Sequence, residues 1–441
     1  MTLDRTPGRG TLLINLGPSH PSMHGTVRVM AELDGERVRS SEVEIGYLHR
    51  GFEKTCENRT WFNLLPYTDR LNYVSPLINN TGYALAVEKL MGVEAPERAQ
   101  YIRVLMNELS RISDHLTCVA AMAMECGAFT VFLYMMKARE FIWDVIEFTT
   151  GARMTTSYIR IGGVRAELHP DYRTALDRAV RETRGVLKDV HGLLDGNRIF
   201  LGRTRGIGVM GADEAVSYGW TGPCLRSTGV SYDLRKARPY LVYDRMDFDV
   251  PLGDRGDNFD RYSVRMQEID QSLRIVEQAA AALPPRGPVA SMGADAVEPS
   301  EAIRESRRRR VGAPVRLSPN LEGSERDVAD GIRARDPRCA VPLKEDAYTT
   351  MEGLISHFLF FMDGRGIRPP VGEVYSAVEG GNGELGFYIV SDGSDKPFRL
   401  HLRAPCFHIV SALERLIQGR FVADIIPTFG SFNMIGGELD R

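Results

Sequence analysis

Two histidines, His20 and His24, lie in a nine-residue segment, Gly17-Pro-Ser-His-Pro-Ser-Met-His-Gly25, whose side chains could exchange protons or bind a metal ion. Two prolines and two glycines in this segment predict a loop of fixed shape. A metal site would need at least one further ligand, and the sequence identifies none. Proton exchange near neutral pH, where imidazole titrates, and an ordinary polar surface loop both remain open.

A carboxylate, Glu125, interrupts an almost wholly apolar run from Cys118 to Met136. A membrane-spanning helix needs about 20 predominantly apolar residues with few or no charges. We therefore predict two buried helices that meet near Gly127 rather than one span. An ionised carboxylate in such surroundings is costly unless it has a partner, which makes Glu125 a candidate functional residue.

Two further patterns could hold ligands. Residues 206–211 match G-x-G-x-x-G, and Asp233 follows about 20 residues later, as in a dinucleotide site. Two arginines stand where the preceding buried strand should be and no second apolar strand follows, so the βαβ frame is missing. Residues 244–260 are acidic enough for a divalent cation but lack the ordered ligand loop of an EF-hand. Because arginines are interleaved with these acids, the pattern favours ion-paired structure.

Composition excludes several classes of protein. Hydrophobic residues make up 43% of the 441 and charged residues 26%, which is typical of soluble globular proteins. A net charge of -3 gives no reason to expect a nucleic-acid partner, which would call for a basic excess. Six cysteines without a C-x-x-C pair argue against a disulfide scaffold and a closed zinc site, and suit a reducing compartment. The N-terminus lacks the basic and apolar regions of a secretory signal.

The elements that must position these residues can be predicted from apolar periodicity. We expect strands at 11–17 and 26–45, the second broken into a hairpin by the polar turn Asp34-Gly35-Glu36. Further strands are expected at 372–378, 385–391 and 398–403. Long helices are expected from Pro96 to near Gly127, at 128–151, at 171–194 and at 257–283, and shorter ones at 348–363 and 408–418. The predicted fold class is α+β and mainly helical, with small sheets near both ends.

Four regions follow from this pattern. Residues 1–60 form an N-terminal β region with the histidine loop, residues 61–284 a helical core, and residues 345–441 a C-terminal α+β region. The segment 285–344 has four consecutive arginines, many acids, serines, glycines and prolines, and few aromatic residues. Such a composition cannot bury enough surface to offset chain entropy, so we predict a mobile charged insertion.

The histidine loop resembles the GPxHPxxHG signature of the D-type (49 kDa-type) subunit of respiratory complex I, the NADH:quinone oxidoreductase. The resemblance continues through Ile45-Gly-Tyr-Leu-His49-Arg50-Gly-Phe-Glu-Lys54 and Tyr67-Thr-Asp-Arg70-Leu-Asn-Tyr73. Further matching blocks lie at 107–112, 158–164, 232–236, 248–257, 383–392 and 438–441. The blocks keep their order and cover nearly the whole chain except the insertion, which is far more specific than any single motif.

The resemblance implies a fold similar to the large subunit of nickel–iron hydrogenases but without the metal site, because the two cysteine pairs that would hold the metals are missing. It also implies a quinone-binding, enzymatic subunit of a proton-translocating complex, peripheral on the cytoplasmic side of the bacterial inner membrane. The implied partners are the B-type iron–sulfur subunit, the C-type subunit, the H-type membrane subunit and, through the complex, the membrane surface. Since NADH would deliver its electrons through other subunits, this chain is expected to bind no NADH, flavin, iron–sulfur cluster or metal.

Carried over to this sequence, the family's quinone head group would receive hydrogen bonds from Tyr73 and His24, with His20 of the same loop also lining the site. A quinone gains two electrons and two protons, so donors at both carbonyls, one able to recover its proton, fit the reaction. The family commonly has Asp where this chain has Glu125, which we expect to stabilise protonated His24. The family often has a histidine near the cluster where this chain has Thr155.

The motif positions His49, Arg50 and Arg70 would lie on the side facing the cluster of the iron–sulfur subunit, where a cation favours the reduced state. Two alternatives stay open from the sequence. The chain could be a non-catalytic bridging subunit of the same or a related membrane-bound complex, or it could belong to a related complex fed by a donor other than NADH.

Overall fold

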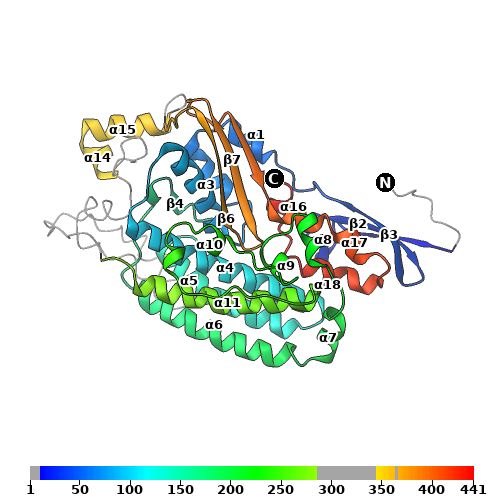
Figure 1. Ribbon diagram of the computed structural model, residues 1–441. Coiled ribbons are helices and arrows are strands. Elements are labelled where there is room, and N and C mark those ends of the chain that lie inside the picture. Colours follow the sequence, from blue (N-terminus) through cyan, green and yellow to red (C-terminus); the bar gives the residue numbers. More distant parts are fainter. Residues whose placement is uncertain (1–9, 286–343, 363–365) are drawn as a thin grey trace, which may run out of the picture.

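The computed structural model describes residues 10–285, 344–362 and 366–441 (Figure 1). The predicted charged insertion, 285–344, lies outside the described residues except at its two ends. The prediction of a mobile insertion therefore stays a prediction.

Three small antiparallel sheets contain all the strands of the described residues. Gly35 has a φ of +60° between the second and third strands, so the predicted hairpin turn is confirmed. The three predicted C-terminal strands are confirmed as well. The sheets consist of β1 (Leu12–Leu16), β2 (Arg28–Asp34) and β3 (Arg37–Glu44); of β4 (Ile159–Arg160) and β5 (Gly163–Val164); and of β6 (Gly372–Glu379), β7 (Glu384–Ser391) and β8 (Arg399–Arg403).

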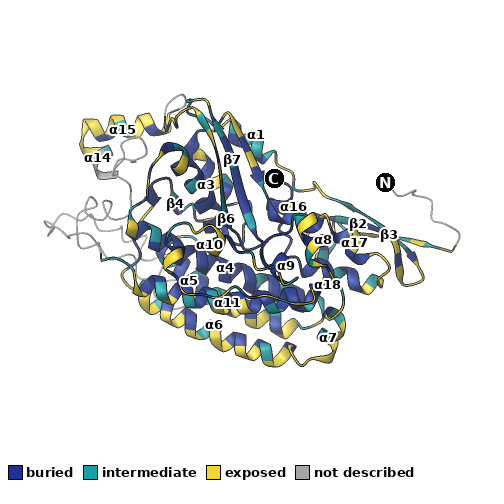
Figure 2. Ribbon diagram, in the orientation of Figure 1, coloured by how far each residue is buried: buried dark blue, intermediate teal, exposed yellow. Residues whose placement is uncertain are grey.

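Five long helices form the body of the molecule. Four of them confirm the predicted long helices, whereas the helix at Pro76–Met91 was not predicted. Figure 2 shows α4 buried along its length, whereas α6 exposes its outer side. α4 packs against α3, α5 and α11, and the sheet β6–β8 packs against α3 (Figure 1). The long helices are α3 (Pro76–Met91), α4 (Glu97–Glu125), α5 (Phe129–Thr150), α6 (Tyr172–Leu194) and α11 (Asn258–Ala281).

Short helices join these elements, and two of the predicted helices are each divided in two. The first divides at Thr350, whose backbone is extended and whose hydroxyl caps the next helix by accepting a hydrogen bond from the Gly353 amide. The second divides near Ser411, whose hydroxyl donates to the His408 carbonyl. The short helices are α1 (Phe52–Glu57), α2 (Leu65–Thr68), α7 (Arg198–Thr204), α8 (Ala212–Ser217), α9 (Gly222–Arg226), α10 (Leu234–Ala237), α14 (Lys344–Thr349), α15 (Met351–Phe361), α16 (Pro405–Val410), α17 (Leu413–Ile417), α18 (Ile425–Gly430) and α19 (Gly436–Leu439), with 3-10 turns η1 (Pro21–Met23), η2 (Trp61–Leu64), η3 (Tyr243–Arg245) and η4 (Val422–Asp424).

The apolar run around Glu125 contains the end of α4 and the start of α5. Gly127 ends α4 with a φ of +90°, as predicted. The expectation that both helices are buried is wrong for the first turns of α5, where Phe129 is 57% and Leu133 is 52% exposed. α5 buries only the face that packs on α4 and α6, and its opposite face lies outside the bundle. Among the described residues, no helix has the length and apolar character needed to cross a bilayer.

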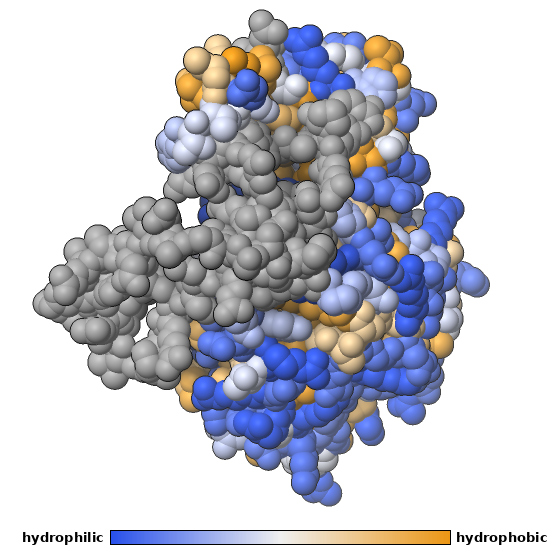
Figure 3. Space-filling view, turned by 90° about the vertical axis from the view of Figure 1, so that its left-hand side faces the viewer, coloured by the Kyte–Doolittle hydropathy of each residue, from blue (hydrophilic) through white to orange (hydrophobic). Residues whose placement is uncertain are grey.

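A second exposed apolar surface lies on α15. Met351, Ile355, Phe358 and Leu359 are all exposed there. Figure 3 views the molecule from the side on which α15 lies and shows apolar side chains gathered at the upper end of this view.

The part of the core that matters for the candidate site joins both ends of the chain. One buried cluster contains Val29 and Leu33 of β2, Trp220, Ile417 of α17 and Phe429 of α18. Figure 1 shows the N-terminal sheet beside α17 and α18. The histidine loop between β1 and β2 is therefore packed against the C-terminal helices.

Candidate functional site

The histidine loop has a fixed shape, as the sequence predicted. His20 caps η1 by accepting a hydrogen bond from the Ser22 amide at its Nδ1, 3.2 Å away. His24 ends the turn in the left-handed region with a φ of +54°. Gly17 is required where it stands, because an added Cβ would lie 2.2 Å from the Val27 carbonyl oxygen. The loop therefore holds both imidazoles in defined positions.

Glu125 at the end of α4 reaches His24. Its Oε1 lies 3.7 Å from Nε2 of His24, and its side chain is only 4% exposed, against 35% for His24. The other carboxylate oxygen has no hydrogen-bond partner among the described residues. Gly430 of α18 leaves room for it, because an added Cβ would lie 1.9 Å away. Burial raises the pKa of Glu125, and His24 and His20 oppose that rise.

Tyr73 lies in the loop between α2 and α3 and is half-buried against the cluster that joins the two ends of the chain. Asn72 fixes this loop, because its side chain accepts from the Val74 amide and donates to Asp114 at 2.8 Å. The hydroxyl of Tyr73 makes no hydrogen bond within the described part of the chain. Burial raises the pKa of Tyr73, with Asp114 adding to the rise and Arg50 opposing it. The phenol is therefore neutral at pH 7 and free to donate.

The predicted cationic positions gather around the C-terminus. His49 contacts the Asp440 carbonyl oxygen through Nδ1 at 2.9 Å. Arg50 donates to the carbonyl oxygens of Arg70, at 2.9 Å, and of Gly437, at 3.2 Å. His49 and Asp440 also line a cavity of about 460 Å³. Arg50 and Arg70 are both exposed, so their remaining N–H groups can meet a ligand or another chain.

The C-terminal segment 429–437 contacts the histidine loop, where the rings of Phe429 and His24 lie 5.9 Å apart between centroids. Its Asn433 donates to Asp114 at 2.7 Å, next to the Tyr73 loop. Its Gly437 passes so close to the Arg70 carbonyl oxygen that an added Cβ would lie 2.4 Å from it. Sequence reasoning did not single out Asp114 or Asn433. A carboxylate within a long apolar helix was the signal that identified Glu125, and it applies equally to Asp114.

Thr155 is exposed in the loop after α5. Two residues further on, Ser157 donates its amide N–H to Asp69 at 2.9 Å. Thr155 therefore lies close in sequence to the residue that anchors this loop beside the turn of Arg70.

The glycine motif at 206–211 lacks the βαβ frame of a dinucleotide site within the described residues. It precedes no βαβ unit, since every strand pairing in the described residues is antiparallel. Its Gly206 amide donates to Asp257 at 2.8 Å. An added Cβ at Gly208 would lie 2.4 Å from Asn258 Oδ1. The glycines thus allow a tight turn to pack on the start of α11.

The acidic stretch 244–260 is ion-paired, as the sequence predicted. Asp247 pairs with Arg274, and Asp249 lies 3.6 Å from the same guanidinium. Asp257 caps α11 by accepting from the Asp260 amide at 2.9 Å. Within the described residues, no group of three or more His, Cys, Asp or Glu side chains could hold a metal ion.

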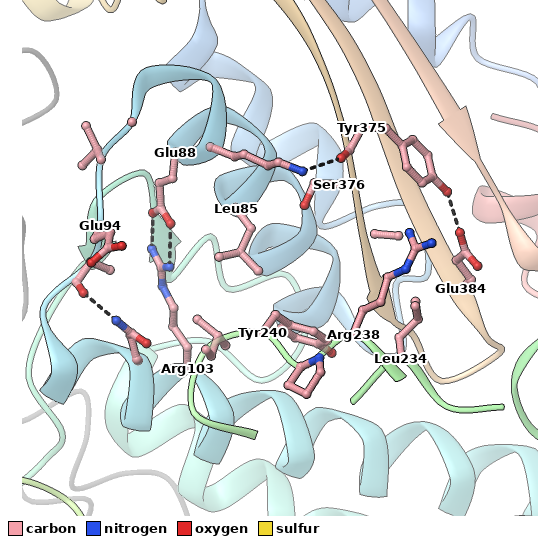
Figure 4. A pocket seen from close by; sticks show the side chains of 18 residues that line it. Leu85, Glu88, Glu94, Arg103, Leu234, Arg238, Tyr240, Tyr375, Ser376 and Glu384 are labelled. Atoms are coloured by element: carbon pink, nitrogen blue, oxygen red, sulfur yellow. Dashed lines mark hydrogen bonds and ion pairs between the residues drawn. The ribbon is translucent and has the colours of Figure 1, made fainter. Parts of the chain in front are cut away.

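A larger cavity of about 710 Å³ lies elsewhere, between α3, β6 and residues 234–241 (Figure 4). Two pairs of its polar side chains bond to one another. Arg103 pairs with Glu88 at 2.6 Å, and the Tyr375 hydroxyl donates to Glu384 at 2.6 Å. None of the predicted site residues lines it.

Comparison with known proteins identifies the family. Residues 125–441 match the family described as "Respiratory-chain NADH dehydrogenase, 49 Kd subunit". The chain is 48% identical to D-type subunit 1 of the NADH-quinone oxidoreductase of Sorangium cellulosum (strain So ce56), over 98% of its own length and 95% of the relative. It is 46% identical to the D-type subunit of the same enzyme from Myxococcus xanthus (strain DK1622), over 98% and 92% of the two chains.

A third relative is longer. The chain is 43% identical to the C/D-type subunit of the NADH-quinone oxidoreductase of Bdellovibrio bacteriovorus (strain ATCC 15356 / DSM 50701 / NCIMB 9529 / HD100), over 98% of its own length and 69% of that protein. The matching family and these relatives agree with the resemblance of the motif blocks. The chain therefore belongs to the D-type (49 kDa-type) family of NADH-quinone oxidoreductase subunits, and is part of a respiratory oxidoreductase complex whose other subunits are its partners.

Proposed function

We propose that this chain binds the quinone and forms, with the B-type iron–sulfur subunit, the site where the quinone is reduced. The observation that carries the proposal is that one C-terminal segment, 429–437, contacts His24, the partner of Glu125, through Phe429 and is bonded through Asn433 to Asp114, which holds the loop of Tyr73. The histidine loop and the Tyr73 loop are thus both tied to the same C-terminal segment.

The chemistry of each group suits quinone reduction. Tyr73 is a neutral phenol that can donate to one carbonyl oxygen of the head group. His24 beside Glu125 can donate to the other and recover its proton. Arg50 and Arg70 supply positive charge on the neighbouring surface, which would favour electron arrival from that side.

The open form of the site supports a shared location. His24 keeps 35% of its side chain exposed and Arg70 is exposed, so a quinone against Tyr73 would be covered on one side only. We assign the covering role to the iron–sulfur subunit and to the H-type membrane subunit. The C/D-type protein of Bdellovibrio supports contact with the C-type subunit. We also propose that the chain is peripheral on the cytoplasmic side of the inner membrane, has a hydrogenase-like fold and binds no NADH, flavin, cluster or metal.

Glu125→Gln is expected to lower quinone reduction about tenfold at neutral pH. The substitution keeps the shape but removes the anion 3.7 Å from His24, so protonated His24 loses its partner. A tenfold loss of rate corresponds to about 1.4 kcal/mol of added activation free energy. The assay compares NADH–quinone activity with reduction of an artificial acceptor upstream.

The matched control is Glu277→Gln, which removes a carboxylate from an exposed pair with Arg184. This control should leave both activities unchanged. An unchanged quinone rate and pH profile in Glu125→Gln would remove the pair from the mechanism.

A further inference from the structure

A cavity of about 620 Å³ lies between α7, the start of β3 and the segment 418–424 that joins α17 to α18. These elements lie together at the end of the molecule that is opposite α14 and α15 (Figure 1). None of the proposed quinone-site residues lines this cavity. Its charged lining residues are Arg37, Arg203, Arg420 and Asp424, and we call it the arginine cavity.

The start of β3 pairs with the segment 418–424 and fixes the backbone of the arginine cavity. The Val38 amide donates to the Arg420 carbonyl oxygen at 2.9 Å, and the Gly419 amide donates to the Val38 carbonyl oxygen at 2.8 Å. This antiparallel contact sets Arg37 opposite Phe421, and the Arg37 guanidinium lies 4.7 Å from the centre of the Phe421 ring. Arg37 and Arg420 therefore extend from a backbone that main-chain hydrogen bonds hold in place.

Carbonyl oxygens hold two of the three guanidinium groups. Arg37 donates from Nη1 to the Gly419 carbonyl oxygen at 3.0 Å, and Arg203 donates from Nη2 to the Ala423 carbonyl oxygen at 2.7 Å. A carbonyl oxygen orients a guanidinium without neutralising its charge. Because each guanidinium carries five N–H groups, both arginines keep donors for a ligand.

The arginine cavity carries more positive than negative charge. Arg203 lies 3.4 Å from Asp424. Within the described residues, neither Arg37 nor Arg420 forms an ion pair with a carboxylate. Three cations around one cavity repel one another, and a bound anion would offset that repulsion. The planar fork of guanidinium N–H groups matches the oxygens of a phosphate group, which it binds through paired hydrogen bonds.

Exposed apolar side chains lie beside these arginines. Phe421 lines the cavity and is 44% exposed, and Ile199 of α7 is 70% exposed. Ile199 precedes Arg203 by about one helical turn, so the two side chains share a face of α7. Cations next to exposed apolar groups suit a phosphate that is attached to a lipid, because the acyl chains can contact the apolar groups.

We propose that the arginine cavity binds the phosphate group of an anionic phospholipid, with Arg37, Arg203 and Arg420 donating hydrogen bonds to its oxygens. Inorganic phosphate offers the same oxygens without acyl chains and is the other source of this chemistry. The proposal does not depend on the quinone site.

Photolabelling of the purified complex in an uncharged detergent tests the proposal. The probe is phosphatidylglycerol with a photoreactive group close to its glycerol backbone. The label is expected within residues 199–207 or 418–424, and excess unmodified phosphatidylglycerol should prevent it. Arg37→Gln together with Arg420→Gln should lower this labelling about tenfold or more, because two charged donors are lost.

The matched control is Arg173→Gln together with Arg184→Gln. It removes the same charge from two arginines of α6 that are about half exposed. The control should be labelled like the wild type, and both double variants should keep the wild-type rate of NADH oxidation with an upstream acceptor.

Equilibrium dialysis of the same complexes against radiolabelled inorganic phosphate distinguishes the two sources. Phosphate binding that is lost only in the Arg37 and Arg420 variant, without lipid labelling of the wild type, would support the cavity as a site but overturn the lipid as its ligand. Equal lipid labelling and equal phosphate binding in the two double variants would overturn the site. Absence of both signals in the wild type would also overturn it, as expected if an acidic segment of another subunit fills the cavity.

Discussion

Phenylalanine at position 73 is expected to lower NADH–quinone reduction by about a hundredfold or more, because it removes a proton donor from the reacting centre. Tyr73 contacts the cluster that joins the two ends of the chain mainly through its ring, which Tyr73→Phe retains. Its hydroxyl bonds to no described residue, so its removal leaves no orphaned partner. The loss should therefore appear in kcat with quinone and leave the stability of the complex unchanged.

The control for Tyr73→Phe is Tyr218→Phe. Tyr218 is also half-buried and packs against the same cluster, but it lies at the end of α8 and belongs to none of the motif positions proposed to meet the quinone. Both variants should keep wild-type reduction of an artificial acceptor upstream. Equal quinone rates in the two variants would show that the hydroxyl of Tyr73 has no part in the reaction.

Methionine in place of Arg226 is expected to destabilise the protein by about 3–5 kcal/mol. Arg226 is fully buried and bonds to Glu268 and Glu379, both at 2.7 Å, and to the Tyr232 carbonyl at 2.9 Å. Burial alone would lower the pKa of Arg226, but the surrounding carboxylates, among them Asp233, outweigh it and hold the pKa above its usual value. Methionine would leave these acids without their shared cation.

The expected readout is less assembled complex in the membrane and loss of NADH–quinone activity at a lower temperature. Arg184→Met is the control. It breaks an ion pair with Glu277 in which both side chains are about half exposed, and such a pair contributes about 1 kcal/mol or less to stability. If Arg226→Met were as stable as Arg184→Met, the buried network would contribute little to the fold.

Periodicity predicted the long elements well because it reports directly on burial. The hairpin at Gly35 and the end of α4 at Gly127 were identified from turn residues, and both are confirmed. The same method failed where helices are short. The division at Thr350 depends on one side-chain cap, which no period records.

A helix that is buried on all sides is a second case in which the sequence predicts the structure incompletely. α4 is enclosed by α3, α5, α11 and α18, and apolar periodicity does not show which elements surround a helix. Asp114 is consequently in the core, held by Asn433 from 319 residues further along the chain. No local pattern links two such positions. The first turns of α5 show the opposite error. Their apolar residues were predicted to be buried, but an apolar sequence pattern does not show whether a residue is buried within this chain.

The chemistry of the site was only partly visible in the sequence. The cost of burying a carboxylate identified Glu125, and the structure places it beside His24. Nothing in composition or spacing would have selected Tyr73, whose proposed role came from the resemblance of its motif block. The position of Tyr73 depends on packing between segments near both ends of the chain.

The most direct test of the central claim is photolabelling of the native complex with a photoreactive short-chain quinone. The label should enter this chain within residues 17–26 or 67–75, and excess unmodified quinone should prevent it. Labelling confined to other subunits, under conditions where the probe is reduced at the normal rate, would contradict a quinone site on this chain and favour a purely bridging role.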